Sequence, residues 1–357
     1  MASTSRLCFA VLSLAALCAP GCAGGTSLPA GRSAAAFVSR DILAGSTDPI
    51  AHHAVAVQKP DGGRSWMAKN ANTIKALLYV SDHHTNDVYV YNFKTGAQVG
   101  KLTGFHDPYG QCVDTAGNVW IANYSSSTVV EYAHGATKPL TTLSTNGYSI
   151  GCTVDYANDL YVANITTPNG PGDLQLWTNE SGTPTNYSNG QECYYLWPPG
   201  AAASGQLILE TNDPYYSCEL LNTLRGDDTT FGNFTIVFPG ATMWDGRNLT
   251  LTDQEYNGNR LTAIDRVSYI VSGGLDLAGQ TVLNDTCNGY DVDVMQPFIV
   301  GSVNPPVNTQ QGTIVVGGNL SCKGRFDFWK YPVGGEPIKT LKNAPLEPYG
   351  ASVSLLP

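Results

Sequence analysis

The chain has 357 residues, of which 13% are charged, and its formal net charge is −10 at pH 7. The 19 basic residues are scattered, which excludes nucleic acid as a partner because phosphate binding needs clustered Lys and Arg. Gly (38), Pro (21) and Tyr (19) are abundant and no stretch shows a sustained helical period, so the sequence predicts short strands joined by tight turns.

Residues 1–22 have the features of a signal peptide. The apolar run at residues 7–17 is too short to span a bilayer and is typical of a signal-peptide core. Gly21-Cys22 resembles the end of a bacterial lipobox, which predicts lipidation of Cys22 after cleavage. The sequence therefore predicts an exported protein of the bacterial cell envelope, lipid-anchored or secreted, whose only contact with the membrane is this anchor.

Residues 23–72 are rich in Ala, Gly, Ser and Pro and have no regular pattern. Such a segment is expected to be a flexible spacer. It would separate the anchor from a folded domain that covers residues 73–357.

A repeat of about 40 residues becomes visible when residues 109–133 are aligned with residues 150–177. Each segment has a glycine, a short apolar strand that ends in Val-Asp, a polar turn, and a second strand that ends in Ala-Asn. A third strand follows, and a further turn leads to a fourth. More degenerate copies have the same order. They cover residues 76–103, 191–238, 240–283 and 289–342, the last with its inner strand expected at 292–295.

The two ends of this array are complementary. The copy at residues 76–103 lacks an inner strand, and the chain ends with an extra one, residues 347–353, which match residues 107–113. Closing the array into a ring removes its exposed sheet edges. The predicted fold is all-β: a six-bladed β-propeller of four-stranded antiparallel blades, whose first blade is closed by the C-terminal strand. It is preferred to seven blades or an open solenoid.

The pattern Pro-x-Gly, apolar-Asp and Gly-Asn-apolar-Trp-apolar-Ala-Asn resembles the NHL repeat. It is also similar to the senescence-marker-protein and gluconolactonase-like six-bladed propellers. The resemblance covers about residues 75–357 and is strongest at 76–180.

In the gluconolactonase-like enzymes, loops that enter the inner strands hold a divalent metal at the channel mouth. The resemblance therefore implies Ca²⁺ or another divalent cation at oxygen-bearing positions. The matching residues are Asp107, Glu192, Asp291 and Glu347. In the alternative interpretation these side chains are solvated loop residues and no cofactor is bound.

Short polar residues end the second strand of each copy. They are Asp82, Asn123, Asn164, Asn212 or Asp213, Asp253 and Asn319. We expect them to cap the turns by bonding to the backbone, although a ring of such groups could also bind ions or sugars. Asp82-His83-His84 is expected to be a solvated loop. His106-Asp107 has the residue types of a base and its orienting acid, but no nucleophile can be placed beside it.

Six cysteines lie outside the signal peptide, which in an oxidising compartment suggests disulfides. Cys112, Cys152 and Cys193 occupy equivalent inner-strand positions, 40 and 41 residues apart. Because adjacent inner strands converge near the axis, a Cys112–Cys152 bond is plausible. The remaining pairs would then be Cys287 with Cys322 and Cys193 with Cys218. In the alternative, some are free buried thiols.

Tyrosines on the loops could stack against a sugar or a peptide if they are exposed. The candidates are Tyr109, Tyr215, Tyr216 and Tyr349. Because no catalytic set can be placed, the sequence favours a non-catalytic, monomeric binding or scaffold module for a protein, peptide or glycan. The alternative is a metal-dependent hydrolase or lactonase of the gluconolactonase-like type.

Overall fold

The computed structural model describes the following parts of the chain. They are residues 63–188, 195–203, 207–208, 211–212, 220–222, 227–229, 236, 239–256, 261–269, 275–284, 294–320, 322–342 and 344–357. All of them belong to the unit Ala34–Pro357, and a separate unit comprises Met1–Ser33. No helix in the described ranges is long and apolar enough to cross a membrane.

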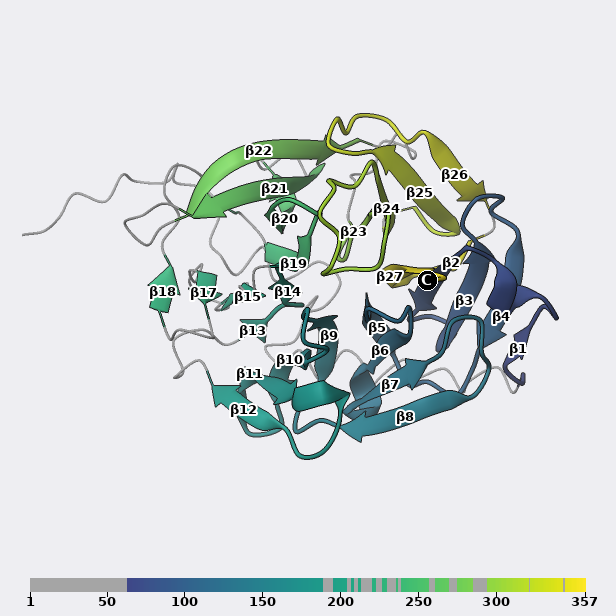
Figure 1. Cartoon of the computed structure of the whole chain (residues 1–357), viewed down its shortest axis with the longest axis horizontal. Helices are drawn as coiled ribbons and strands as arrows, with labels where there is room; N and C mark the ends of the chain where they lie inside the picture. Colours follow the sequence, from purple (N-terminus) through teal and green to yellow (C-terminus); the bar gives the residue numbers. More distant parts are fainter. Residues whose placement is uncertain are drawn as a thin grey trace, which may run out of the picture. The chain divides into compact units, whose positions relative to one another are not determined.

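Five antiparallel sheets contain most of the described strands, which confirms an all-β propeller of four-stranded blades (Figure 1). Four of the sheets have four strands in chain order. They are β5 (Pro108–Val113), β6 (Val119–Asn123), β7 (Thr128–Tyr132) and β8 (Pro139–Ser144); β9 (Ser149–Val154), β10 (Leu160–Thr167), β11 (Gly170–Trp177) and β12 (Thr185–Ser188); β19 (Pro239–Trp244), β20 (Leu249–Tyr256), β21 (Leu261–Tyr269) and β22 (Leu275–Leu283); and β23 (Phe298–Val300), β24 (Ile314–Gly318), β25 (Arg325–Lys330) and β26 (Lys339–Lys342).

The fifth sheet joins the two ends of the described chain. Its order is β1 (Trp66–Met67), β4 (Gln98–Leu102), β3 (Asp87–Asn92), β2 (Ala76–Asp82) and β27 (Pro348–Leu355). β27 pairs antiparallel with β2 from Leu355 opposite Ala76 to Pro348 opposite Asp82. The C-terminal strand therefore closes the first blade, as the sequence predicted.

β1 adds an outer strand to this blade. Met67 lies opposite Gly100, where a Cβ atom would come within 2.0 Å of the Met67 sulfur. A 3-10 turn, Ala71–Thr73, follows; two others are Tyr124–Ser126 and Thr178–Glu180. The folded unit therefore includes residues that the sequence analysis assigned to the spacer.

The prediction of six four-stranded blades is wrong in number, because the described residues form five. The copy expected at 191–238 contributes only two-stranded ladders among its described residues. They are β13 (Tyr195–Leu196) with β16 (Thr211–Asn212), β14 (Gly200–Ala201) with β15 (Leu207–Ile208), and β17 (Leu220–Asn222) with β18 (Asp227–Thr229). Pro198-Pro199 separates β13 from β14, and proline cannot donate to a ladder, so the strand is interrupted there.

The innermost strands contact one another in a closed order. β27 contacts β5, β5 contacts β9, and β9 contacts β14. β14 contacts β19, β19 contacts β23, and β23 contacts β27 again. The ladder strand β14 therefore occupies the place between the inner strands of two complete blades. In the last blade the inner strand is β23, a few residues after the predicted 292–295, because Pro297 precedes it.

The Val-Asp endings of the repeat are explained by the turns that follow the inner strands. Asp114 Oδ1 accepts the Asn118 backbone N–H at 2.8 Å, and Gly117 has a φ of 87°. Asp155 makes the equivalent bond to Asp159 N–H at 2.9 Å. Each carboxylate thus replaces a backbone acceptor in a tight turn, which fixes the hairpin between the first two strands.

Apolar side chains fill the spaces between blades. The largest cluster joins the first, second and last blades through residues such as Leu78, Val90, Val130 and Phe328. Trp120, Trp177 and Trp329 are fully buried in the smaller clusters. Each blade therefore depends on its neighbours for burial of its apolar faces.

Glycines allow the inner strands to approach closely at the axis. A Cβ atom on Gly110 of β5 would lie 2.5 Å from the Ile150 carbonyl oxygen, and one on Gly350 of β27 would lie 2.3 Å from the Tyr109 carbonyl oxygen. Gln296 adds a side-chain bridge: its Oε1 accepts the Gln111 N–H at 2.9 Å, and its Nε2 donates to the Gln111 carbonyl at 3.0 Å. The amide thus pairs with the edge of β5 as a neighbouring strand would.

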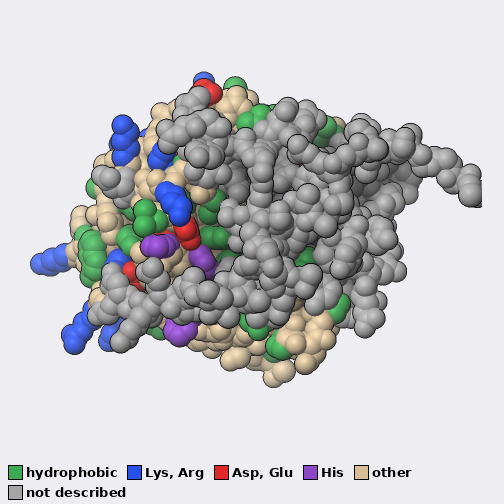
Figure 2. Space-filling view, turned by 180° about the vertical axis from the view of Figure 1, so that it is seen from behind, with side chains coloured by type: hydrophobic (Ala, Val, Ile, Leu, Met, Phe, Trp, Pro, Cys, Tyr) green, Lys and Arg blue, Asp and Glu red, His purple; other side chains and the backbone are tan. Residues whose placement is uncertain are grey.

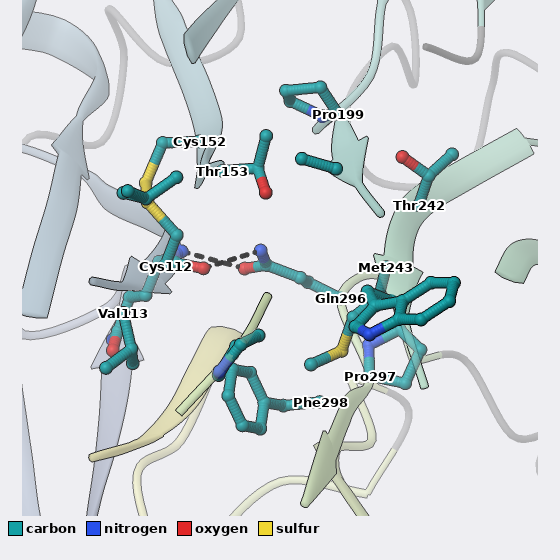
Figure 3. A pocket seen from close by; sticks show the side chains of 15 residues that line it. Cys112, Val113, Cys152, Thr153, Pro199, Thr242, Met243, Gln296, Pro297 and Phe298 are labelled. Atoms are coloured by element: carbon teal, nitrogen blue, oxygen red, sulfur yellow. Dashed lines mark hydrogen bonds between the residues drawn. A yellow bond between two sulfur atoms is a disulfide. The ribbon is translucent and has the colours of Figure 1, made fainter. Parts of the chain in front are cut away.

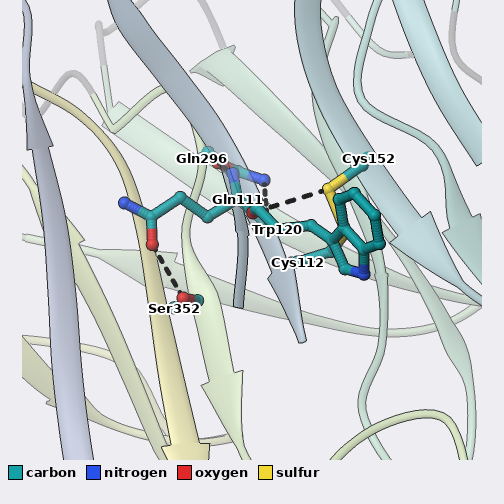
Figure 4. Close-up of a disulfide and its surroundings, with 6 residues drawn as sticks. All are labelled: Gln111, Cys112, Trp120, Cys152, Gln296 and Ser352. Atoms are coloured by element: carbon teal, nitrogen blue, oxygen red, sulfur yellow. Dashed lines mark hydrogen bonds between the residues drawn. A yellow bond between two sulfur atoms is a disulfide. The ribbon is translucent and has the colours of Figure 1, made fainter. Parts of the chain in front are cut away.

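The structure confirms the disulfide between Cys112 and Cys152, whose Cα atoms are 5.5 Å apart (Figure 4). It joins β5 to β9 beside the buried Trp120. Cys322 is also disulfide-bonded, to a partner outside the described residues. Cys193, Cys218, Cys287 and the lipidation candidate Cys22 lie outside the described residues.

The close approach at the axis can be tested with Gly110→Ala. We expect this substitution to destabilise the fold by about 2–3 kcal/mol, because the new methyl group must displace backbone rather than a flexible side chain. Chemical denaturation measures the loss. Gly170→Ala is the matched control, since a Cβ atom there meets nothing within 4 Å; equal stability of the two variants would contradict this account.

Candidate functional site

The candidate site lies where loops enter the inner strands β5 and β27. Asp107 and Glu347 come directly before these strands, and His83 follows β2. The His83 backbone N–H donates to the Glu347 carbonyl at 3.1 Å, so the three loops meet. Figure 2 shows histidine side chains beside acidic and lysine side chains on one part of the described surface.

Asp107 is the buried centre of this site. Its backbone has a φ of 55°, and its N–H donates to Asn86 Oδ1 at 2.6 Å. One carboxylate oxygen accepts a hydrogen bond from the Ser125 hydroxyl, and the other lies 3.1 Å from His83 Nδ1. The chain thus holds a buried carboxylate in an uncommon backbone conformation, which is a feature of functional sites.

The histidine beside Asp107 is His83, not its sequence neighbour His106. The His106 backbone N–H instead donates to Asn123 Oδ1 at 2.7 Å. The His83 side chain is 17% exposed, so it lies between the buried carboxylate and solvent. A ligand that contacts His83 would therefore act on Asp107 as well. The expectation that this loop is merely solvated is wrong for His83.

A row of aromatic rings extends from His83 across three blades. The ring centroids are 5.1 Å apart between His83 and Tyr349, 4.6 Å between Tyr349 and Tyr109, 4.8 Å between Tyr109 and Tyr124, and 5.2 Å between Tyr124 and Tyr148. The middle rings are buried, and the row ends at the half-buried Tyr148. The row connects the site rigidly to the core.

The exposure expected for Tyr109 and Tyr349 is not observed, since they are only 1% and 6% exposed. Both rings pack in an apolar cluster between blades. Burial, followed by the neighbouring Tyr349 and Tyr124, raises the pKa of Tyr109 well above its usual value. These phenols therefore stay neutral. Tyr215 and Tyr216 lie outside the described residues.

The carboxylate of Glu347 points to the surface, where its Oε1 lies 3.2 Å from Lys323 Nζ. An exposed pair of this kind contributes little stability. Asp107 and Glu347 thus precede neighbouring inner strands, but their carboxylates have different partners. The other two predicted metal ligands, Glu192 and Asp291, lie outside the described residues.

The polar residues that end the second strands act as caps. The two oxygens of Asp82 accept N–H groups of Glu347 and Leu346 at 3.0 and 3.3 Å, so they order the approach to β27. Asn123 caps His106 in the same way, and Asn164 Nδ2 bonds to Asp173 Oδ1 at 2.7 Å. This agrees with the capping interpretation at these positions.

A second polar group, which the sequence analysis did not identify, lies on the opposite side of β5. Ligand oxygens of Asp114, Glu131 and Glu180 all lie within 4.8 Å of one another. Asn118 Nδ2 donates to Asp114 Oδ2 at 2.7 Å and to Glu131 Oε1 at 2.9 Å. Burial and the two other carboxylates raise the pKa of Glu180 to about 7. A shared proton can therefore relieve the repulsion in this group.

The axis beyond Gln296 contains a narrow cavity with a free volume of about 30 Å³, enough for one or two water molecules. Figure 3 shows Gln296 pointing across it toward the strand that carries Cys112. Met243 and Phe298 line the other side. The cavity is too small for a sugar or a peptide side chain, so the loop face is the better candidate for binding.

No family model matches the sequence, and no curated protein matches it. The fold is similar to that of solved structures. The β-propeller domain of Cps50 (Swd1) from Myceliophteria thermophila has 10% identity and a TM-score of 0.50, with 82% of this chain and 89% of that chain covered. A protein of unknown function from Bacteroides caccae has 11% identity and a TM-score of 0.51, with 78% and 99% covered. At such identities the similarity shows the fold alone.

The carboxylate group can be tested with Glu180→Gln. A carboxyl whose pKa rises from about 4.5 in the unfolded chain to about 7 in the fold binds protons more tightly when folded, so stability decreases as pH rises between these values. Because Glu180 is partly exposed, we expect the variant to gain only about 1 kcal/mol, or a Tm increase of about 2 °C, at pH 8. Thermal denaturation at pH 5 and pH 8 measures it. An equal effect at both pH values would contradict the assignment.

Proposed function

We propose that this chain is an exported propeller that acts as a binding or scaffold module for a protein, peptide or glycan, with the ligand on the face that carries His83. The observation that supports it best is the contact between His83 and the buried Asp107. The pair is built from loops of two blades and continues into the row of tyrosines. Such a rigid, partly exposed polar group suits recognition, since little side-chain entropy is lost on binding.

The chemistry of this face fits a ligand with both polar and apolar parts. His83 supplies a polar group, Glu347 and Lys323 supply charges of both signs, and Tyr148 supplies part of an aromatic ring. The other candidate space, the axial cavity, is nearly filled. The similarity of the repeat to NHL propellers is part of the same proposal, and so is action as a monomer.

The alternative is a metal-dependent hydrolase or lactonase. One feature favours it: Asp107 precedes an inner strand and lies beside a histidine, so a divalent ion such as Ca²⁺ would find oxygen and nitrogen donors in one place. Metal analysis of the purified protein and lactone turnover separate the two proposals. Stoichiometric metal and turnover that are both lost in Asp107→Asn would replace the binding module by the enzyme.

Binding can be tested by applying the purified mature protein to an immobilised glycan panel and to a displayed peptide library. For any ligand found, we expect His83→Ala and Tyr148→Ala each to weaken binding about tenfold or more, as loss of a central contact does. Tyr156→Ala is the matched control, because Tyr156 is 58% exposed in the turn between β9 and β10, away from this face. Ligands that are lost only in Tyr156→Ala would contradict the proposed face.

Export and lipid anchoring through Cys22 belong to the same proposal. We expect the full chain, expressed in a bacterium, to be cleaved before Cys22, to carry acyl chains on it, and to fractionate with membranes. Cys22→Ala should lose the acylation and leave the membrane fraction. Mass spectrometry of the mature N-terminus decides. A chain that keeps Met1 and stays in the cytoplasm would contradict export.

A further inference from the structure

His134 lies where the two ends of the ring meet the second blade. It belongs to the turn between β7 and β8. Its Nε2 is 2.7 Å from the carbonyl oxygen of Ile74, which lies just before β2, and its Nδ1 is 2.6 Å from the hydroxyl of Ser354 in β27. One imidazole thus connects the N-terminal side of the first blade, the C-terminal strand and the neighbouring blade.

The hydrogens in this contact can be counted. The Ile74 carbonyl can only accept, so Nε2 must carry a proton. The Ser354 hydroxyl has one hydrogen, and the Gly117 carbonyl oxygen, which also only accepts, lies 2.5 Å from the same Oγ. A neutral imidazole has a bare Nδ1, so the hydroxyl must serve either Nδ1 or Gly117. Only a doubly protonated ring would satisfy all three contacts at once.

The surroundings oppose that charge. His134 is 9% exposed and has no carboxylate partner among the described residues. The titratable groups on the elements around it are the phenol of Tyr79, which accepts the Gly135 N–H at 2.8 Å, and the exposed Lys75 next to Ile74. Burial lowers the pKa of His134, and the bond to Ile74 opposes this to a smaller extent. A protonated ring would be a buried charge without a counter-ion, which is unfavourable.

We propose that His134 is a pH-sensitive clasp, which holds the ends of the ring to the second blade when neutral and loosens when protonated. Protonation would turn the Ser354 hydroxyl from His134 toward Gly117, and would place a positive charge between two elements that are held by short polar contacts. An exported protein meets varying pH, so such a clasp would couple the ring closure to its environment.

The sign follows from the direction of the shift. Above the unfolded-state value of about 6.5 the ring is neutral in both states, and the clasp contributes fully. As pH falls below it, the unfolded chain takes up a proton more readily than the folded one, so stability is lost. Glu180 acts in the opposite direction in part of this range. The test therefore compares variants rather than relying on the native curve alone.

The experiment measures Tm of the mature protein at pH 7.5 and 5.5 for the native chain, His134→Gln and His106→Gln. Glutamine can donate and accept but cannot be charged in this range. We expect the native chain and the exposed His106→Gln control to lose about 3 °C more than His134→Gln on acidification. Equal losses in all three would overturn the proposal.

A second measurement covers the case in which His134→Gln does not fold. The imidazole carbon and proton shifts of His134 are followed by NMR in the native chain, with the signal assigned by selective labelling. We expect a midpoint below about 6.5, together with a change in the amide signals of Ser354 and Gly117 over the same pH range. A midpoint above that value, or no change at these amides, would overturn the clasp.

Discussion

The structure depends on closure of the ring by its last strand. β27 contributes a complete ladder to β2, contacts β5 and β23, and carries Gly350 at the crowded axis. No blade can bury both of its faces alone, so every interface between blades requires the ring to stay closed. The disulfide between β5 and β9 restrains the chain at the neighbouring contact. Stability is therefore shared among distant parts of the chain.

The same closure builds the candidate site. Asp82 caps the approach to β27, Glu347 accepts from His83, and the ring of Tyr349 packs between His83 and Tyr109. The face proposed for binding is thus assembled from the first loops of the domain and its last residues. A ligand there would stabilise the closed ring, and opening of the ring would weaken the site. The His134 clasp lies at the same junction, which makes the site and the clasp candidates for coupling.

The sequence predicted the parts of the fold that local patterns specify. The clear copies at 109–133 and 150–177 became β5 to β7 and β9 to β11, and the match between the two chain ends predicted β27 and its partner β2. The interrupted ladder strands after Pro198-Pro199 were not predicted, because the spacing of the repeat continues through a segment that cannot form full ladders. Of the site, Asp107, Tyr109 and Tyr349 were identified by position. Their burial, the contact of His83 with Asp107 and the group around Glu180 arise between loops of different copies, where no local spacing shows them.

Hydrogen exchange measured residue by residue tests the central claim most directly. If the ring is closed by its last strand, the amides of β27 exchange as slowly as those of β2 and change together with them under mild denaturant, since both open only in the same cooperative event. If β27 were a loosely attached tail, its amides would exchange at nearly the rates of a free peptide while β5 to β7 stayed protected. That result would contradict the closed propeller.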